Sequence, residues 1–196
     1  MICAQLVGRL SCRRHCDRRG VCQTDALLWL VALVLCFATP LRAHDPYESF
    51  TLASVRADAL ELTTTIAQAT ALKLIDPEAR IAGLTSENFP QVRARLAREG
   101  ATLFVVTSLK APLAVRSVVA ELTDENDVLF KIIYPRPAPG RLHLHAAFLR
   151  KLGPAYGGII DSADADGHQL GWEQLSWENP NLEITVLPPP SPAKKK

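Results

Sequence analysis

The stretch SFTLASVRADALELTTTI, residues 49–66, decides the fold class. Phe50 and Leu52 alternate with small or polar residues, and after a short break the alternation resumes with Leu60 and Leu62. Residues that alternate in this way point to opposite faces of a strand. Two such runs separated by a polar break predict an antiparallel hairpin with one apolar face.

Similar short runs follow along the rest of the chain. We expect strands at 102–107, 113–122, 128–134, 141–147, 157–163, 169–175 and 182–187. The runs 113–122 and 128–134 are apolar on both faces, which is typical of the central strands of a sandwich. The turn Asp164–Gly167, which separates two of the runs, is a strong hairpin signal. The chain is therefore predicted to be mostly β-structure.

One helix interrupts the strands. Thr85 or Ser86 can cap its start, and Pro90 fits its first turn, where a missing N–H costs little. Gly100 ends the helix after three basic residues. These signals together predict a helix that closes at Gly100.

Two other segments do not fit the strand pattern. Residues 70–75 suit either a helical turn or a strand, and residues 148–152 suit a short turn. About eight short strands with one short inserted helix predict an immunoglobulin-like β-sandwich. The order of the strands in the sheets does not follow from these patterns.

Residues 1–43 have the features of a secretory signal. Five arginines lie within 9–19, the apolar run ALLWLVALVLCFA spans 26–38, and Ala43 offers a small residue before the cut. We expect cleavage after Ala43, so that the mature chain begins at His44. The apolar run is shorter than the roughly 20 residues that a spanning helix needs. An uncleaved segment that tethers the protein to the membrane remains the alternative, and a mis-start of the reading frame would account for the long basic extension.

This processing divides the chain into three expected parts. They are a signal peptide at 1–43, an exported domain at 44–187 and a disordered Pro- and Lys-rich tail at 188–196. All five cysteines lie in the first part, and the remainder carries 16 basic and 18 acidic residues. The exported part is thus free of thiols and slightly acidic, which excludes a disulfide scaffold, a thiol enzyme and a basic nucleic-acid-binding protein.

Three histidines are candidate metal ligands. His143 and His145 lie two positions apart in an expected strand and therefore share one face. His44, as a new N-terminus, would offer its α-amino group and its ring together, as in the histidine-brace copper proteins, with Asp45 as an axial candidate. Copper or nickel binding by the three histidines is thus one hypothesis. The other is a polar strand face in solvent.

No catalytic set emerges from the rest of the chain. The sequence has no Gly-x-Ser-x-Gly, no glycine-rich phosphate loop and no His-Glu-x-x-His. A hydrolase that uses Asp161, Asp164 or Glu173 stays open as a further hypothesis, although turns favour aspartate in any case. We expect a protein that is not an enzyme and that holds no cofactor.

Four aromatic residues admit two interpretations. They either line a ligand surface or fill the core and rim of the sandwich, which is the commoner place for aromatic residues. The residues are Tyr134, Tyr156, Trp172 and Trp177.

The order of several segments resembles a known bacterial family. The segments are SFTLASVRADALELTTTI, SENFPQVRARLAREG with TLFVVT, YPRPAPGRLHLHAAFLRKL and IIDSADADGHQLGWEQLSWENPNLEITV. Over most of 44–187 they are similar to the extracytoplasmic β-sandwich region that precedes the membrane helices of HupE/UreJ-type proteins. In that family the membrane part is associated with nickel transport or with accessory roles for hydrogenase and urease. Nothing after Ala43 approaches a spanning length, so the resemblance implies an exported sandwich domain and metal handling, but not transport.

The expected function is binding. We expect a non-catalytic exported β-sandwich, periplasmic or secreted, that binds a protein of the bacterial cell envelope or a membrane surface. The sandwich pattern and the lack of a catalytic set support this interpretation, and the basic tail suits an anionic surface. Nucleic acid is not expected as a partner, and the sequence leaves the oligomeric state open.

Overall fold

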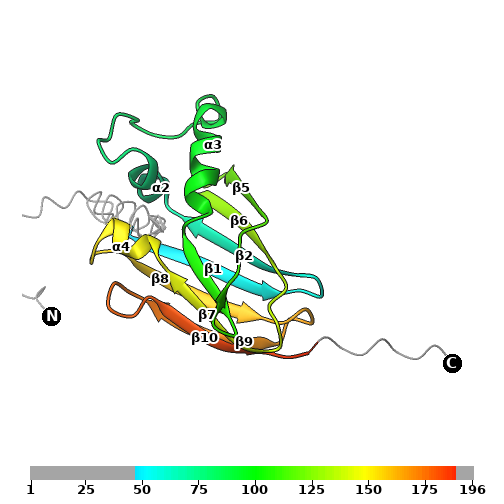
Figure 1. Ribbon diagram of the computed structural model, residues 1–196. Helices are drawn as coiled ribbons and strands as arrows, with labels where there is room; N and C mark the ends of the chain where they lie inside the picture. Colours follow the sequence, from blue (N-terminus) through cyan, green and yellow to red (C-terminus); the bar gives the residue numbers. More distant parts are fainter. Residues whose placement is uncertain (1–46, 189–196) are drawn as a thin grey trace, which may run out of the picture. The chain divides into compact units, whose positions relative to one another are not determined.

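The computed structural model describes residues 47–188, which form ten strands and three helices (Figure 1). The strands are β1 (Glu48–Val55), β2 (Ala59–Ile66), β3 (Phe104–Ser108), β4 (Ala111–Pro112), β5 (Ser117–Leu122), β6 (Val128–Pro135), β7 (Gly140–Ala146), β8 (Gly157–Ala163), β9 (Gln169–Leu175) and β10 (Asn181–Val186). The helices are α2 (Gln68–Ile75), α3 (Phe89–Gly100) and α4 (Phe148–Leu152). The prediction of a mainly β chain is confirmed. The estimate of about eight strands and one helix was too low, because β4, α2 and α4 are short.

The strands form two sheets. The larger has six strands in the order β5-β6-β2-β1-β8-β9, and the smaller has four in the order β10-β7-β3-β4. Neighbours in both sheets run antiparallel except for β1 and β8, which are parallel. Parallel neighbours need a long connection, and here that connection contains most of the chain. Figure 1 shows β7 and β10 toward one end of the larger sheet and α2 and α3 toward the other.

The two sheets share one hydrophobic core. The Tyr134 hydroxyl on β6 donates a hydrogen bond to the Phe104 carbonyl on β3 over 3.2 Å. The Phe104 ring meets the Phe148 ring of α4 edge to face, with centroids 5.7 Å apart. At the other side of the core, a Cβ on Gly171 of β9 would come within 2.7 Å of the Ile184 side chain on β10. These close contacts join the inner faces of the two sheets.

Helix α3 covers the β5 end of the larger sheet. A Cβ on Gly100 would lie 2.8 Å from both Phe130 and Val118, so only glycine allows the helix end to approach so closely. The prediction that the helix ends at Gly100 is confirmed, and the reason is space. The prediction of a central strand is wrong for β5, because among the described strands it pairs with β6 alone and lies at the sheet edge.

The start of α3 is one turn later than the cap candidates suggest. Asn88 is the residue before the first helical position, and Pro90 lies in the first turn as expected. Thr85 takes part through a reciprocal pair of bonds: its N–H donates to Asn88 Oδ1 over 2.8 Å, and its Oγ1 accepts from the Asn88 N–H over 3.3 Å. Thr85 therefore closes the turn that leads into the helix.

Strand β1 faces the opposite way from that expected. Thr51 and Ala53 are fully buried, whereas Phe50 is 49% exposed and Leu52 is 36% exposed. The pairing explains this orientation, because Ala53 lies opposite Leu62, and paired residues point to the same side of a sheet. The prediction of one apolar face is thus correct for β2 and wrong for β1, which presents its larger apolar side chains to solvent.

Candidate functional site

The candidate metal-binding histidines lie on the outer face of the smaller sheet. His143 and His145 are two positions apart on β7, and both side chains are half-buried. His145 Nδ1 is 2.8 Å from Asn181 Oδ1 on the neighbouring strand β10. Because a carboxamide oxygen only accepts, this contact places the ring proton on Nδ1 and leaves Nε2 as the nitrogen with a free lone pair.

His143 borders an open hollow of about 460 Å³ at the β3–β4 turn. Glu183 lies opposite it on β10 and is paired with Arg141, with 3.5 Å between nitrogen and oxygen. The turn itself is unusual, since Leu109 and Lys110 both have positive φ, at 49° and 69°. That left-handed backbone holds both residues at the rim of the hollow.

The expected third ligand, His44, and the axial candidate, Asp45, lie outside the described residues. Within 47–188, a single group of three ligating residues has its atoms within 4.8 Å of one another, and it consists of Asp164, Asp166 and His168. The described part of the chain therefore brings His143 and His145 to one face and adds no third ligand to them.

The group at Asp164 forms a turn in the structure. Asp164 Oδ1 accepts the N–H groups of Asp166 and His168, each over 2.9 Å, and Oδ2 lies 3.1 Å from His168 Nδ1. These bonds, above all the one from the His168 backbone, hold the pKa of Asp164 below its usual value. The carboxylate thus closes the β8–β9 hairpin, and the predicted hairpin is confirmed.

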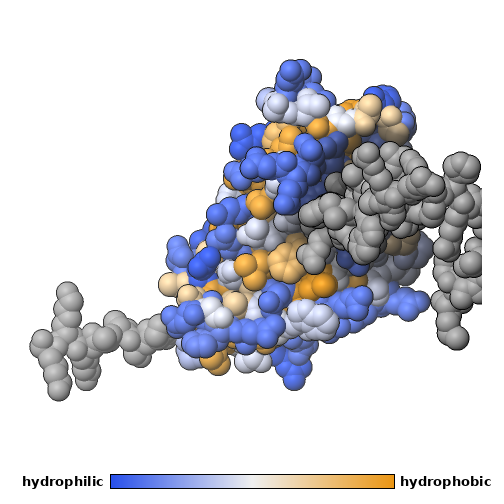
Figure 2. All heavy atoms as spheres, turned by 180° about the vertical axis from the view of Figure 1, so that it is seen from behind, coloured by the Kyte–Doolittle hydropathy of each residue, from blue (hydrophilic) through white to orange (hydrophobic). Residues whose placement is uncertain are grey.

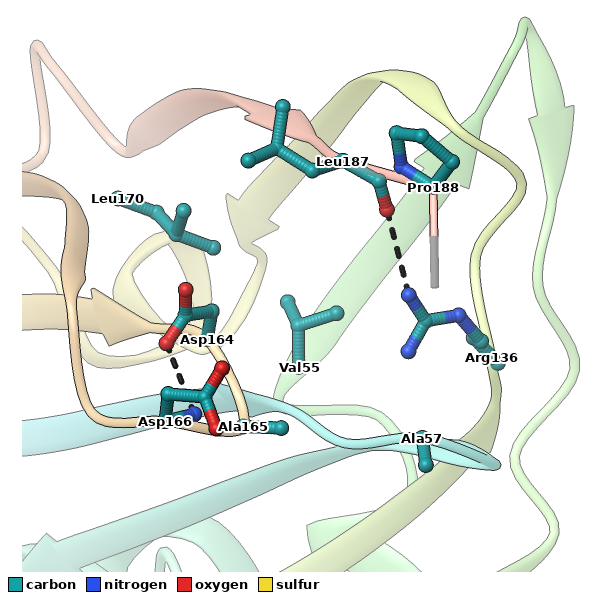
Figure 3. Close-up of a pocket in the computed structure, with 9 residues that line it drawn as sticks. All are labelled: Val55, Ala57, Arg136, Asp164, Ala165, Asp166, Leu170, Leu187 and Pro188. Carbon is teal, nitrogen blue, oxygen red and sulfur yellow. Dashed lines mark hydrogen bonds between the residues drawn. The ribbon is translucent and has the colours of Figure 1, made fainter. Parts of the chain in front are cut away.

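A second hollow, of about 270 Å³, lies beside this turn (Figure 3). Figure 3 shows Asp164 and Arg136 on either side of Val55. Arg136 donates to the Leu187 carbonyl over 3.2 Å and also to the Arg56 carbonyl. Both charged groups are thus engaged in joining loops at this end of the sheets.

The three carboxylates considered for hydrolysis do not form an acid pair. Asp161 lies opposite Trp172 on β9, so the next residue, Glu173, points to the other face of the sheet. Asp161 accepts a hydrogen bond from Gln169 and Glu173 accepts one from Asn179. Each carboxylate has a separate structural role.

The outer face of the six-stranded sheet, which we call the open face, carries an apolar patch around Asp161. Phe50 on β1 lies beside Ile159 on β8, and Leu52 follows two positions later. Trp172, 54% exposed, extends the patch onto β9. Figure 2, which views the molecule from behind, shows hydrophobic residues among hydrophilic ones on this side. An exposed apolar patch is typical of a surface that meets another molecule.

The aromatic residues do not form a shared ligand surface. Tyr134 is buried in the core, where burial raises its pKa to about 12. Tyr156 contacts Tyr47 edge to face at 5.2 Å, and Lys73 lies 4.7 Å from its ring centre. Only Trp172 of the four lies on the open face, while Trp177 follows the end of β9.

Sequence reasoning missed the open face. Alternation in 49–66 shows that Phe50 and Leu52 share a face, but not that this face is outside. One signal was present: the opposite face of the same strand carries side chains no larger than valine, which suits close packing against a second layer. The polarity of Ser49 and Thr51 hid that signal.

Comparison with known proteins adds no relative. No protein-family model matches the chain, and no curated protein matches it. Within 47–188, no helix is long and apolar enough to cross a membrane.

Proposed function

We propose that this protein is a non-catalytic binding module of the bacterial cell envelope and that it works through the open face. The observation that carries the proposal is the patch formed by Phe50, Leu52, Ile159 and Trp172 on a regular sheet. Burial of these side chains against a partner would release about 25 cal/mol per Å² of apolar surface. The paired sheets support an immunoglobulin-like β-sandwich as the fold of this module.

Export is part of the proposal. The basic residues of 9–19, the apolar run 26–38 and the small residue Ala43 support cleavage before His44 and a periplasmic or secreted location. The resemblance to HupE/UreJ-type proteins supports the same compartment. Cell fractionation with mass spectrometry of the intact chain tests this step, because cleavage after Ala43 predicts a product that begins at His44. A chain that keeps its first 43 residues in the cytoplasm would exclude export.

A photo-crosslinking residue tests the binding surface. We would place a benzophenone amino acid at Gln174, an exposed open-face position beside Ile159, and in a second protein at Arg141 on the smaller sheet. We expect an adduct in producing cells from position 174 and none from position 141. The Phe50→Asp change should abolish the adduct. Equal labelling at both positions, or none at 174, would refute the proposal.

Metal binding is the second candidate function. The observation that favours it is the bond from His145 Nδ1 to Asn181, since a fixed ring that keeps Nε2 free is the usual arrangement of a metal-binding histidine. In this proposal His44, His143 and His145 hold copper or nickel.

Metal titration of the exported protein tests whether these histidines bind a metal ion. We expect one copper or nickel ion per chain by calorimetry, and loss of binding in His143→Ala and His145→Ala. Asn181→Ala should weaken binding about 10- to 100-fold because the ring loses its orienting partner. His168→Ala, at the β8–β9 turn, is the matched control. Equal affinity in all variants would exclude this site.

A further inference from the structure

We propose that the partner of the open face is a second copy of this chain, related to the first by a two-fold axis that runs along the strands between β1 and β2. This inference rests on the proposed function, because it names the partner of the same surface. The six-stranded sheet has its centre between β2 and β1. Rotation about an axis there places β2 over β1, β6 over β8 and β5 over β9 of the second copy, which is the self-complementary arrangement of a two-fold dimer.

The registers define which residues would meet. Two rows of open-face residues cross the sheet from β5 to β9. The first row is Val119, Lys131, Thr63, Leu52, Asp161 and Trp172, and the second is Glu121, Leu129, Thr65, Phe50, Ile159 and Gln174. The axis reverses each row in the second copy, so the first residue of a row faces the last.

The charges in the first row complement each other under this rotation. Lys131 on β6 faces Asp161 of the second copy on β8, and the reverse pair forms by symmetry. Lys131 is half exposed and already lies 3.2 Å from Glu61, while Asp161 is half-buried. Lysine and aspartate side chains together span the roughly 10 Å between packed sheets. No like charges oppose each other in either row.

The apolar residues complement each other as well. Trp172 faces Val119 of the second copy, and Ile159 faces Leu129. Phe50 and Leu52, near the axis, lie over threonines of the second copy's β2. Each large apolar side chain therefore meets an apolar or small partner, as the core of a sheet-on-sheet interface requires.

The area is sufficient for a stable dimer. Six strands about 4.8 Å apart and six to eight residues at about 3.3 Å each make a face of roughly 25 by 23 Å. That is about 600 Å² per copy and about 1,200 Å² in total, at the lower end of the roughly 1,200–2,000 Å² of specific interfaces.

Sedimentation velocity of the exported protein over a dilution series tests the inference. We expect a dimer that dissociates at low concentration. Lys131→Asp and Asp161→Lys each place like charges opposite one another twice, and each should raise the dissociation constant at least about a hundredfold. Mixing the two variants should restore a one-to-one heterodimer, because each chain then supplies the charges that the other lacks. Arg141→Asp, on the smaller sheet, should leave the dimer intact.

The outcomes separate this inference from the proposed function. Far-UV circular dichroism identical to the wild type shows that each variant is folded. A monomer at all concentrations, a dimer that survives both charge changes, or a mixture that stays monomeric would each overturn the inference. A monomer whose Gln174 adduct contains a different protein would overturn it while the proposed function stands. No adduct at Gln174 would instead count against the proposed function.

Discussion

The hydroxyl oxygens of Thr51 and Thr64 lie 3.1 Å apart on the inner face of the six-stranded sheet, and both side chains are fully buried. Each residue supplies the hydrogen-bond partner that the other loses from water, so the pair is tolerated inside the protein. The same strand orientation sends Phe50 and Leu52 outward. The buried polar pair and the exposed apolar patch are therefore two consequences of one register.

The threonine pair predicts non-additive stability changes. Thr51→Val keeps the shape but removes the bond and leaves Thr64 without this partner, at a cost of about 1–2 kcal/mol. The double change Thr51→Val and Thr64→Val should be nearly neutral, because no hydroxyl is left unpaired there. Urea unfolding of the two single variants and the double variant measures this coupling. A double variant destabilised by the sum of the single effects would contradict the account.

The orientation of β1 predicts which residues of the β1–β2 hairpin tolerate polar substitution. Phe50→Ser and Leu52→Ser should each lower the free energy of unfolding of the monomer by only about 1 kcal/mol, since the two side chains are 49% and 36% exposed. Leu62→Ala should cost about 2–5 kcal/mol, because Leu62 is fully buried. Urea unfolding at high dilution measures these values. Large losses in the two serine variants would place the open face inside instead.

Tyr134 predicts a loss of stability at alkaline pH. Burial raises its pKa from 10.0 to about 12, so the unfolded chain ionises this phenol first. The contribution is fully present below pH 10 and declines as the pH rises toward 12, by about 3 kcal/mol in all. Tyr134→Phe should lose about 1 kcal/mol below pH 10, with the bond to Phe104, and should lack this decline. The free energies of unfolding of the wild type and of Tyr134→Phe are measured at pH 9 and pH 11. An equal loss of stability in both proteins between these pH values would refute the assignment of the decline to Tyr134.

The position of Arg93 predicts that its side chain protects the sheet edge at β5 from amide exchange. Its Nε donates to the Ala120 carbonyl on β5 over 3.1 Å, and β5 is an edge strand of the described sheet. Arg93→Ala should cost about 1.5 kcal/mol and speed amide exchange in β5, because an edge carbonyl loses its charged partner. Gln91→Ala, on the same helix, is the control. Unchanged exchange in β5 would show that α3 protects this edge without Arg93.

The local elements were largely predictable. The turn at Asp164–Gly167 and the alternation in 59–66 act over a few residues, and both hairpins form as expected. The helix end at Gly100 was also predictable, although its cause is contact with Phe130. The position of β5 was not predictable, because a strand apolar on both faces fits a central strand as well as an edge strand covered by a helix.

The candidate sites were predictable only in part. Two histidines that are two positions apart on one strand share a face because side chains alternate. In the structure His143 and His145 lie on the same face of β7. The hydrogen bond from His145 Nδ1 to Asn181 Oδ1 joins residues 36 positions apart and depends on the pairing of β7 with β10. No local pattern carries that information.

The sequence by itself determined where strands and turns begin, because side-chain alternation and turn chemistry depend on near neighbours. Only the tertiary structure decided which side of β1 lies inside. Alternation places Phe50 and Leu52 together, but the pairing of Ala53 with Leu62 and of β1 with β8 sets the side that meets the second layer. Pairing joins distant parts of the chain, so the face that we propose for binding exists only in the folded protein.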